Sequence, residues 1–479
     1  MIQKQEVRSG ARANYATKLP FLYLFEKKEE KPMTGSWRNI RYSRRVLLQS
    51  AAKTALTALA LGTVAPALVG CEQVRLPGMA QKKTLVYWAH TFPPAVDYVT
   101  KTLIPEWQQK RPDIEIKYET VPHSDFEKKL LTALAAGTGP DMYQTWDPNV
   151  PLYVKNKRMA PVIPEAFGYK TQEELIKAFM PGSLKAFIIE GKLYGVPLEY
   201  NTLSLWYRSD IYREVGLDPN NPPKTWDQLG EYAAKCTVRE GEKMVRAGFQ
   251  WPWKSNIWYM ITFVPIVRQA GGDLVDATGT RSQANTEPVQ RAMQIYADMV
   301  FKYKAADPAF VIENDFANGR WVSQISGIYF MPAVLKQNPK LKYGENFRVG
   351  QLPQIEGGKP STILYAWLWT VNPASKLQRE AWEWISFMSE HGAGWFKNVG
   401  YIQPRLGWLD SPEAKENPAL PVFLEDFKYG EYLPRTVVYQ EMETLLGQAI
   451  ERVIMQKIPI KDSLQTLHEE LTKALQRAG

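Results

Sequence analysis

The sequence predicts an α/β protein built on a parallel sheet with helices on both faces. Strand-like and helix-like segments alternate between residues 84 and 146, which is the order of elements that a parallel sheet requires. Capping-box spacings mark further helix starts along the chain. The part of the chain after residue 71 has about 400 residues, more than one hydrophobic core usually holds, so we expect two domains.

The first five elements follow the order strand, helix, strand, helix, strand. Residues 84–89 are an apolar run between polar residues, and residues 114–118 alternate at period two, so both are predicted strands. A helix is predicted between them, over residues 96–111. A second helix is predicted from Ser124, which opens a capping-box pattern, and residues 141–146 form the third strand.

Helices dominate the rest of the prediction. Capping-box spacings place helix starts at Thr171, Thr225 and Ser375. In the last quarter of the chain, most segments are predicted to be helical. The helices predicted there cover residues 379–389, 439–456 and 463–476.

An export signal is predicted near the start of the chain. Arg44 and Arg45 precede an apolar stretch rich in Ala and Leu over residues 51–69, which is the order of a signal peptide. The arginine pair resembles the twin-arginine export motif, although two neighbouring residues depart from it. A transmembrane anchor is the alternative, but a span needs roughly 20 apolar residues, and Lys53 and Pro66 interrupt this stretch.

Cys71 follows the apolar stretch and is the predicted lipidation site. With residues 68–70 it forms the sequence Leu-Val-Gly-Cys, which resembles a lipobox, where the cysteine becomes the lipidated first residue of the mature protein. We therefore expect residues 1–71 to be an N-terminal extension with a signal peptide, and residues 72–82 to be a tether. Lipid on Cys71 would hold the protein at the membrane, on the periplasmic or cell-surface side. The other cysteine is Cys236, so no disulfide framework is expected.

The formal net charge of +9 does not indicate nucleic-acid binding. Residues 1–71 hold 12 Lys or Arg against 4 Asp or Glu, whereas the rest of the chain holds 47 against 46. The basicity therefore belongs to the exported leader, where positive charge stays on the cytoplasmic side, and no basic tract with interleaved aromatics remains. The 4 histidines are far apart and show no zinc-like spacing. We expect no nucleic-acid partner, no metal and no cofactor.

Four segments along the chain share the order of motifs found in a known family. They are KLLTALAAGTGPD at residues 129–141, KLYGVP and LWYRSD within residues 192–210, the segment 319–329, and GYIQPR at residues 400–405. Together they resemble the extracellular solute-binding proteins of ABC importers, specifically the sugar-binding proteins related to maltose-binding protein. The resemblance spans nearly all of residues 83–479.

The resemblance implies a two-lobed periplasmic-binding-protein fold of type II. Two α/β lobes would be joined by crossover strands and would close over the ligand at a hinge. Lobe 1 is expected to comprise residues 83–198 and to return for residues 356–390. Lobe 2 is expected to comprise residues 199–355 and a helical return over residues 391–479. The first crossover is expected at residues 196–199, where a proline fixes the backbone.

The resemblance and the predicted sheet together suggest where a ligand binds. Ligands of open α/β sheets collect at the carboxyl ends of strands, which places Trp88 and His90 after the first strand, and Trp146 and Asp147 after the third, at the cleft. A sugar site needs aromatic rings for CH faces and directional polar groups for hydroxyls. The candidate polar residues are His90, Asp147, Glu199, Asn201 and Arg405, and the candidate rings are Trp88, Trp251, Trp253, Tyr329, Trp367 and Tyr401.

Structural roles compete with ligand binding for several of these residues. A Trp in an α/β lobe most often lies in the core, and Asp147 and Glu199 could instead cap a helix or form a salt bridge. The Trp-Pro-Trp segment at residues 251–253 is the strongest ring candidate, because two rings beside a stiff proline in a predicted loop are hard to bury together. Residues 365–367 (Tyr-Ala-Trp) stand where relatives often carry a glycine pair, so we expect a smaller or reshaped cleft.

The family resemblance implies a binding lipoprotein with no chemistry of its own. It would capture a sugar or polyol as a monomer and deliver it to the transmembrane subunits of an ABC permease. One alternative is a protein of the same fold for a polyamine, a metal chelate or an anion, although the acid or tyrosine clusters for such ligands are not evident. A second alternative is a secreted carbohydrate-active enzyme, since paired carboxylates among aromatics also describe a glycosidase. The sequence marks no such pair as acid and nucleophile.

Overall fold

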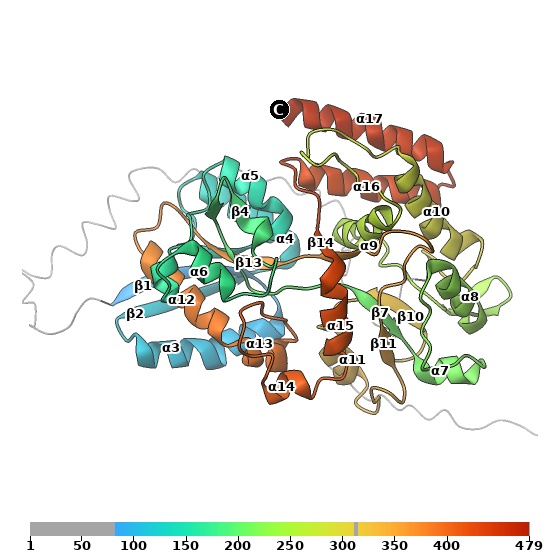
Figure 1. The fold of residues 1–479 in the computed structure, drawn as a ribbon, viewed down its shortest axis with the longest axis horizontal. Helices are drawn as coiled ribbons and strands as arrows, with labels where there is room; N and C mark the ends of the chain where they lie inside the picture. Colours follow the sequence, from blue (N-terminus) through green and yellow to red (C-terminus); the bar gives the residue numbers. More distant parts are fainter. Residues whose placement is uncertain (1–81, 311–314, 479) are drawn as a thin grey trace, which may run out of the picture. The chain divides into compact units, whose positions relative to one another are not determined.

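The computed structural model describes residues 82–310 and 315–478. The predicted export signal, with Arg44, Arg45 and Cys71, lies outside these residues. The described residues belong to one compact unit, and Figure 1 shows how its helices surround two sheets. No helix in the described part of the chain has the length and apolar character needed to cross a membrane.

A five-stranded sheet forms the centre of the first lobe. Its strand order is β2-β1-β3-β13-β6; β1 is parallel to β2 and β3, whereas β13 is antiparallel to β3. The three strands predicted between residues 84 and 146 are therefore confirmed. The alternate β1 side chains Leu85, Tyr87 and Ala89 are fully buried, as expected for one face of a strand. The strands are β1 (Lys83–His90), β2 (Ile114–Val121), β3 (Met142–Trp146), β6 (Val196–Pro197) and β13 (Trp367–Val371).

Helices α3, α4 and α12 pack on this sheet. The first is part of a continuous helical segment that confirms the helix predicted over residues 96–111. α4 begins at His123, one residue before the start predicted at Ser124. Glu127, which the predicted capping box placed at the helix start, instead accepts hydrogen bonds from Thr145 Oγ1 and the Trp146 amide at the end of β3. The helices are α2 (Pro93–Tyr98), the π-helical turn η1 (Val99–Leu103), α3 (Ile104–Lys110), α4 (His123–Ala135) and α12 (Gln378–Glu390).

The other capping-box predictions have different outcomes. Thr171 and Thr225 are N-caps as predicted, since each side-chain oxygen accepts a hydrogen bond from the backbone N–H three residues later. The start predicted at Ser375 is wrong, because α12 begins three residues further along. The Ser375 hydroxyl instead donates to the Asp141 carboxylate at 2.6 Å, and thereby links the start of β3 to the segment after β13.

A three-stranded antiparallel sheet forms the centre of the second lobe. Its middle strand is β7, flanked by β10 and β11. α9 packs against α10 and α16, and α16 packs against α17; the C-terminal helices predicted from the sequence are confirmed. The elements are β7 (Ser204–Tyr207), β10 (Ser323–Ser326), β11 (Arg348–Gly350), α9 (Asn256–Gln269), α10 (Glu287–Phe301), α16 (Tyr439–Ile454) and α17 (Ile460–Ala478).

Shorter elements complete the two lobes. The further helices are α5 (Val150–Lys155), α6 (Gln172–Lys177), α7 (Ser209–Glu214), α8 (Trp226–Cys236), α11 (Phe330–Gln337), α13 (Gly392–Val399), α14 (Pro412–Lys415) and α15 (Leu420–Asp426). The further strands are β4 (Ile188–Ile189), β5 (Lys192–Leu193), β8 (Val238–Glu240), β9 (Lys243–Arg246), β12 (Thr362–Leu364) and β14 (Gly430–Tyr432). Short 3-10 turns are η2 (Asp147–Asn149), η3 (Pro164–Phe167), η4 (Lys185–Phe187) and η5 (Phe427–Tyr429).

Two antiparallel crossover segments connect the sheets. After β6 the chain continues into β7, and after β12 it continues in the opposite direction into β13. The Glu199 amide donates to the Trp367 carbonyl, and Asn201 pairs with Tyr365 in a short antiparallel bridge. The first of these segments therefore leaves the first sheet after β6 and runs through Glu199 and Asn201.

The position of α13 changes one expected lobe boundary. The Trp395 ring on this helix contacts Tyr98 edge-on, with 5.1 Å between the centroids, and Trp369 of β13, with 5.8 Å between the centroids. α13 therefore packs with the first lobe, and the boundary expected at residue 391 lies too early in the chain.

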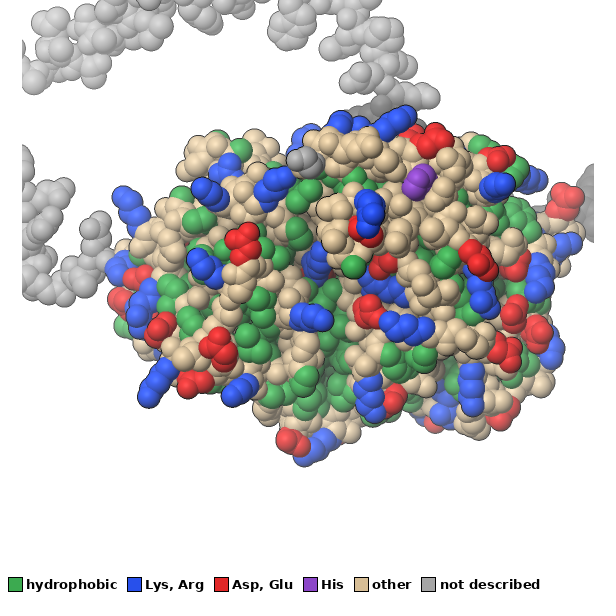
Figure 2. All heavy atoms as spheres, turned by 45° about the horizontal axis from the view of Figure 1, so that its top comes forward, with side chains coloured by type: hydrophobic (Ala, Val, Ile, Leu, Met, Phe, Trp, Pro, Cys, Tyr) green, Lys and Arg blue, Asp and Glu red, His purple; other side chains and the backbone are tan. Residues whose placement is uncertain are grey.

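The surface charges agree with the near-neutral balance of the chain after residue 71. On the face drawn in Figure 2, Lys and Arg side chains are interspersed with Asp and Glu side chains rather than gathered in one basic patch. Elsewhere in the described chain, exposed charges also pair with one another, as in the Lys342–Glu345 and Lys428–Glu425 pairs.

Candidate ligand-binding site

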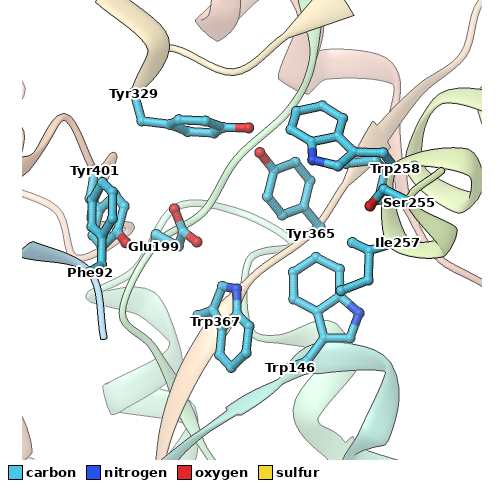
Figure 3. A pocket seen from close by; sticks show the side chains of 11 residues that line it. Phe92, Trp146, Glu199, Ser255, Ile257, Trp258, Tyr329, Tyr365, Trp367 and Tyr401 are labelled. Atoms are coloured by element: carbon cyan, nitrogen blue, oxygen red, sulfur yellow. The ribbon is translucent and has the colours of Figure 1, made fainter. Parts of the chain in front are cut away.

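A cavity of about 320 Å³ is enclosed by residues of both lobes. Figure 3 shows aromatic rings facing this space from several elements. Seven of the lining residues are aromatic, and one is charged. The lining consists of Phe92, Trp146, Glu199, Ser255, Ile257, Trp258, Ile261, Tyr329, Tyr365, Trp367 and Tyr401.

The strand directions explain why first-lobe rings meet at this place. β1 and β3 are parallel, so the residues at their carboxyl ends lie at the same edge of the sheet, where ligands of α/β proteins collect. Trp146 ends β3, and Phe92 follows β1 by two residues. β13 is antiparallel to β3, so its first residue, Trp367, pairs in register with Trp146 at that edge. The second lobe contributes the first two turns of α9 and Tyr329, the residue before α11.

Glu199 supplies the carboxyl group of the cavity. It lies on the first crossover segment and is only 4% exposed. Its Oε2 accepts a hydrogen bond from the Asn201 side-chain amide, and Figure 3 shows the carboxyl group among Tyr401, Tyr329 and Trp367. Burial, opposed by the bond from Asn201, raises the pKa of Glu199 to about 8, because an ionised carboxylate in this apolar site loses its hydration.

The rings form two groups around this carboxyl group. Phe92 and Tyr401 stack with 5.6 Å between their centroids and an interplanar angle of 15°. Trp146 lies 5.6 Å from Trp367 and 5.5 Å from Tyr365, centroid to centroid. Burial raises the pKa of the tyrosines that line the cavity, so their hydroxyls stay protonated at neutral pH and can donate hydrogen bonds.

A second cavity, of about 920 Å³, lies on the opposite face of the crossover segments. Tyr200 and Leu364 line it, whereas their chain neighbours Glu199 and Tyr365 line the aromatic cavity, as alternation along extended chain requires. Its lining is rich in charge rather than in rings. The charged residues are Lys185, Arg268, Asp273, Asp276, Lys428, Glu431 and Arg435.

Four of the eleven residues expected at the ligand line the aromatic cavity: Glu199, Tyr329, Trp367 and Tyr401. Two others lie outside the lining and contact residues that belong to it. Asn201 holds the Glu199 carboxyl group. The His90 imidazole packs against the Trp367 ring with 4.3 Å between the centroids. The remaining five lie elsewhere.

Asp147 is a correction to the sequence-based expectation. Its side chain is fully buried, pairs with Arg435 at 2.7 Å and accepts a hydrogen bond from the Ala366 amide at 3.0 Å. Asp147 does not line the cavity, because its carboxylate holds the end of β3 to the crossover and to Arg435. The salt-bridge alternative considered for this residue is the one observed.

Arg405 and Trp88 also lie outside the cavity lining. The Arg405 guanidinium pairs with Glu390 at 3.1 Å and donates to the Ser389 hydroxyl, so it ties the end of α12 to the segment after α13. The Trp88 ring lies under the Lys129 ammonium of α4, with 4.6 Å between the nitrogen and the ring centroid. Both side chains are occupied by contacts within the first lobe.

The expectation for the Trp-Pro-Trp segment is wrong, because both rings are buried. Trp251 is 1% exposed and stacks on Tyr296 of α10, with 3.8 Å between centroids and 7° between planes. Trp253 is 8% exposed, and its indole N–H donates to Gln250 Oε1. The proline does not prevent burial, because Tyr296 of α10 covers the Trp251 ring and Gln250, in the loop before α9, accepts the Trp253 N–H.

Seven lining residues were not among the named ligand contacts, although one of them, Trp146, was expected at the cleft because it ends the third strand. Trp258, Ile257 and Ile261 come from one face at the start of α9, and Trp258 follows the Trp-Pro-Trp segment by five residues. The spacing of Ile257 and Ile261 on a helix, with the aromatic residue between, was the signal that could have located this face. The others are Phe92, Trp146, Ser255 and Tyr365. Tyr365, expected only to narrow the cleft, contributes a ring to it.

Within the described residues, no group of three or more His, Cys, Asp or Glu side chains is arranged to hold a metal ion. The described residues that line the cavity supply one carboxyl group, and their other polar side chains carry hydroxyls or indole N–H groups. Such a site can bind a compact ligand with apolar faces and a small number of polar groups.

The sequence of this chain is similar to those of known proteins. The model of the family described as bacterial extracellular solute-binding protein matches residues 94–425. A putative binding protein of Brucella abortus (strain 2308) is 23% identical over 370 residues, which cover 73% of this chain and 83% of that protein. The maltotriose-binding protein of Pyrococcus abyssi is 23% identical, with 82% of each chain covered. The sn-glycerol-3-phosphate-binding periplasmic protein UgpB of Salmonella typhimurium is 25% identical, with 67% of this chain and 74% of that protein covered.

Solved structures share the fold. An ABC transporter solute-binding protein from Thermotoga lettingae, bound with α-D-tagatose, has a TM-score of 0.72 at 20% identity, covering 82% of this chain and 100% of that chain. An ABC substrate-binding protein from Listeria monocytogenes, in complex with cycloalternan, has a TM-score of 0.71 at 18% identity, covering 82% and 99%. The two-lobed periplasmic-binding-protein fold expected from the sequence is therefore confirmed.

Proposed function

Since this chain belongs to the bacterial extracellular solute-binding proteins, we propose that it is the substrate-binding component of an ABC importer and captures a sugar or polyol between its lobes. The observation that carries this proposal is the cavity, in which seven rings surround a few polar groups. Sugars present apolar CH faces to such rings and hydroxyls to directional polar groups. The protein would then deliver the ligand, as a monomer, to the transmembrane subunits of a permease.

The size and charge of the cavity support a compact ligand that is not an anion. About 320 Å³ is at the small end of the roughly 300–1,000 Å³ typical of ligand pockets. Relatives bear names for both maltotriose and sn-glycerol-3-phosphate. Among the described lining residues there is no Lys or Arg to pair with a phosphate. These features favour the saccharide over the phosphate ester.

The same geometry argues against the alternative of a carbohydrate-active enzyme. A glycosidase needs two carboxyl groups that flank the scissile bond, roughly 5–10 Å apart. The described lining has one, Glu199, and the neighbouring Asp147 is buried in its ion pair with Arg435. We therefore propose that the protein binds its ligand without transforming it.

Trp258→Ala should weaken saccharide binding by about 1–3 kcal/mol, the scale of losing one aromatic contact surface. The ring lines the cavity and is only partly buried, so the melting temperature should change little. Isothermal titration against a panel of sugars and polyols would measure the loss. Trp321→Ala is the matched control, because this ring is also partly buried but lies outside the cavity lining.

The panel also tests the proposed function itself. Binding of a sugar or polyol by the wild-type protein, weakened in Trp258→Ala and unchanged in Trp321→Ala, is the expected result. If peptides, polyamines or metal complexes bind and no sugar or polyol does, the solute-binding family assignment stands but the saccharide proposal does not.

We also propose export by the twin-arginine route and lipid anchoring outside the plasma membrane. The support is the Arg44-Arg45 pair and the Leu-Val-Gly-Cys sequence that ends at Cys71. Cys71→Ser should leave the precursor unprocessed or release the protein from membranes, because the acyl chains provide the anchor. Membrane fractionation of wild type and variant would show this. Equal membrane association of both would contradict lipidation, and unchanged export after replacing both arginines with Lys would contradict the twin-arginine route.

A further inference from the structure

Glu199 presents a carboxyl group to the cavity, and no described residue of the lining is positively charged. Its side chain is buried, and its Oε2 accepts a hydrogen bond from the neutral Asn201 amide. The described lining contains no Lys, Arg or His. The nearby carboxylate of Asp147 is negative, so it raises the pKa of Glu199 further, and it is itself paired with Arg435. An ionised Glu199 therefore has no counter-ion among the described residues, which is costly for a buried charge.

The rings around Glu199 favour a positive charge in the same space. The faces of Trp, Tyr and Phe attract an ammonium group within about 6 Å of the ring centroid, more strongly where water is excluded. Seven such rings line this cavity, contributed by both lobes and by the crossover. Apart from Glu199, the polar side chains of the described lining are uncharged hydroxyl and indole groups. A ligand cation would thus meet both aromatic faces and a carboxylate.

We propose that the ligand is an amino sugar, whose ammonium group binds beside the Glu199 carboxylate within the aromatic cavity. This inference rests on the proposed saccharide function and adds the charge of the ligand to it. The sugar ring stacks on the aromatic side chains while the ammonium group donates to the carboxylate. Asn201 is a positioning residue, since it holds Oε2. An ammonium–carboxylate bond is stronger than a neutral hydrogen bond, especially in a site of low polarity.

The charge of the ligand determines the direction in which protons move on binding. Glu199, with its pKa raised to about 8 by burial, carries a proton in most free molecules near pH 7. A bound ammonium group favours the carboxylate and lowers that pKa, so binding releases up to about one proton per ligand. The affinity for an amino sugar therefore rises from pH 6 toward pH 8, as long as the amine stays protonated. A neutral sugar that accepts a hydrogen bond from the protonated carboxyl group releases no proton and binds more weakly above pH 8.

Several other titratable groups among the described residues lie near the cavity. The tyrosine hydroxyls of the lining have a pKa raised above 10 by burial and stay neutral between pH 6 and 8. Burial raises the pKa of Asp147 to about 6, but its carboxylate is paired and lies outside the lining. His90 packs on the Trp367 ring from the end of β1. Because glutamine does not titrate, any proton release that remains in a Glu199→Gln variant comes from these other groups.

Isothermal titration with matched triplets of saccharides tests the inference. Each triplet contains an amino sugar, its N-acetyl derivative and the parent hydroxyl sugar, with the amine at different ring positions in different triplets. Titrations at pH 7 in two buffers of different ionisation enthalpy give the number of protons released. The amine member should bind tightest in its triplet, by roughly 10- to 100-fold, the range for a hydrogen bond between charged groups, with proton release.

Two variants assign this preference to one side chain. Glu199→Gln keeps the shape and the hydrogen-bonding capacity of the side chain but removes its charge, so the amine preference and the proton release should both disappear. The matched control is Glu443→Gln. Glu443 is partly buried, and burial raises its pKa to about 7, but it lies on α16 outside the cavity lining. This control should retain the preference and the proton release.

The outcomes separate this inference from the proposed function. If a parent or N-acetyl sugar binds tightest without proton release, the ligand is neutral; the amino-sugar inference is then overturned while the saccharide function stands. An amine preference that persists in Glu199→Gln would also overturn the role given to Glu199. If no saccharide in the triplets or the wider panel binds, the proposed function fails, and this inference fails with it.

Discussion

Replacing Trp251 with Ala is expected to lower the free energy of unfolding by about 3–5 kcal/mol, the range for removing a large buried aromatic side chain. The Trp251 ring is 1% exposed and stacks on Tyr296 at 3.8 Å. Phe249 contacts it edge-on at 4.7 Å, and Trp226 of α8 lies at 5.7 Å. Alanine would leave a cavity among these rings that the surrounding helices cannot fill. Denaturant unfolding followed by circular dichroism would measure the loss.

The ligand affinity of folded Trp251→Ala is expected to be unchanged, because the ring does not line the cavity. Trp258→Ala is the reciprocal control, with lowered affinity and nearly normal stability. The two substituted positions lie seven residues apart, and each variant replaces a Trp with Ala. The expected difference in stability and affinity therefore comes from where each ring packs. A Trp251→Ala protein with normal stability and lost ligand binding would instead restore the role expected from the sequence.

Replacing Arg435 with Ala is expected to cost about 3–5 kcal/mol near pH 8, the range for removing one partner of a buried ion pair. Arg435 donates to both the carboxylate and the backbone carbonyl of Asp147, and Asp147 is fully buried. Without the guanidinium, an ionised Asp147 would have no counter-ion at the junction of β3 and the crossover. Adding Asp147→Asn to this variant should recover part of the loss, because the unpaired charge is removed.

The cost of Arg435→Ala should decrease as the pH falls. Burial already raises the pKa of Asp147 to about 6 in the presence of Arg435, and loss of Arg435 raises it further. The folded variant then binds more protons than the unfolded chain over a wider pH range, so its stability falls more steeply as the pH rises. Thermal unfolding between pH 5 and 8 would show the difference between variant and wild type growing with pH.

A surface ion pair provides the control for the Arg435 experiment. Lys342 and Glu345 lie 3.5 Å apart, and both side chains are more than half exposed. Lys342→Ala should change stability by no more than about 1 kcal/mol, because solvent screens such pairs. An Arg435→Ala variant that loses no more stability than this control, at any pH, would show that the buried pair does not brace the fold.

Local patterns in the sequence determined the elements of this protein. Period-two alternation and apolar runs located the strands of the first sheet, and Thr171 and Thr225 marked true helix starts. These predictions succeed because a strand face or an N-cap depends on residues a few positions apart. The ordered motifs also indicated the solute-binding family and located Glu199 and Tyr401, two residues that line the cavity.

Only the tertiary structure decided which side chains meet the ligand site. Trp251 and Trp258 look equally suitable in the sequence, but Tyr296 of α10 covers Trp251, while the first turns of α9 direct Trp258 to the cavity. Asp147 is occupied by Arg435, 288 residues further along the chain. The physical reason is that the burial and the charge of a side chain depend on the residues that pack against it. In a two-lobed chain whose segments cross between the lobes, those residues come from distant parts of the sequence, which no local pattern records.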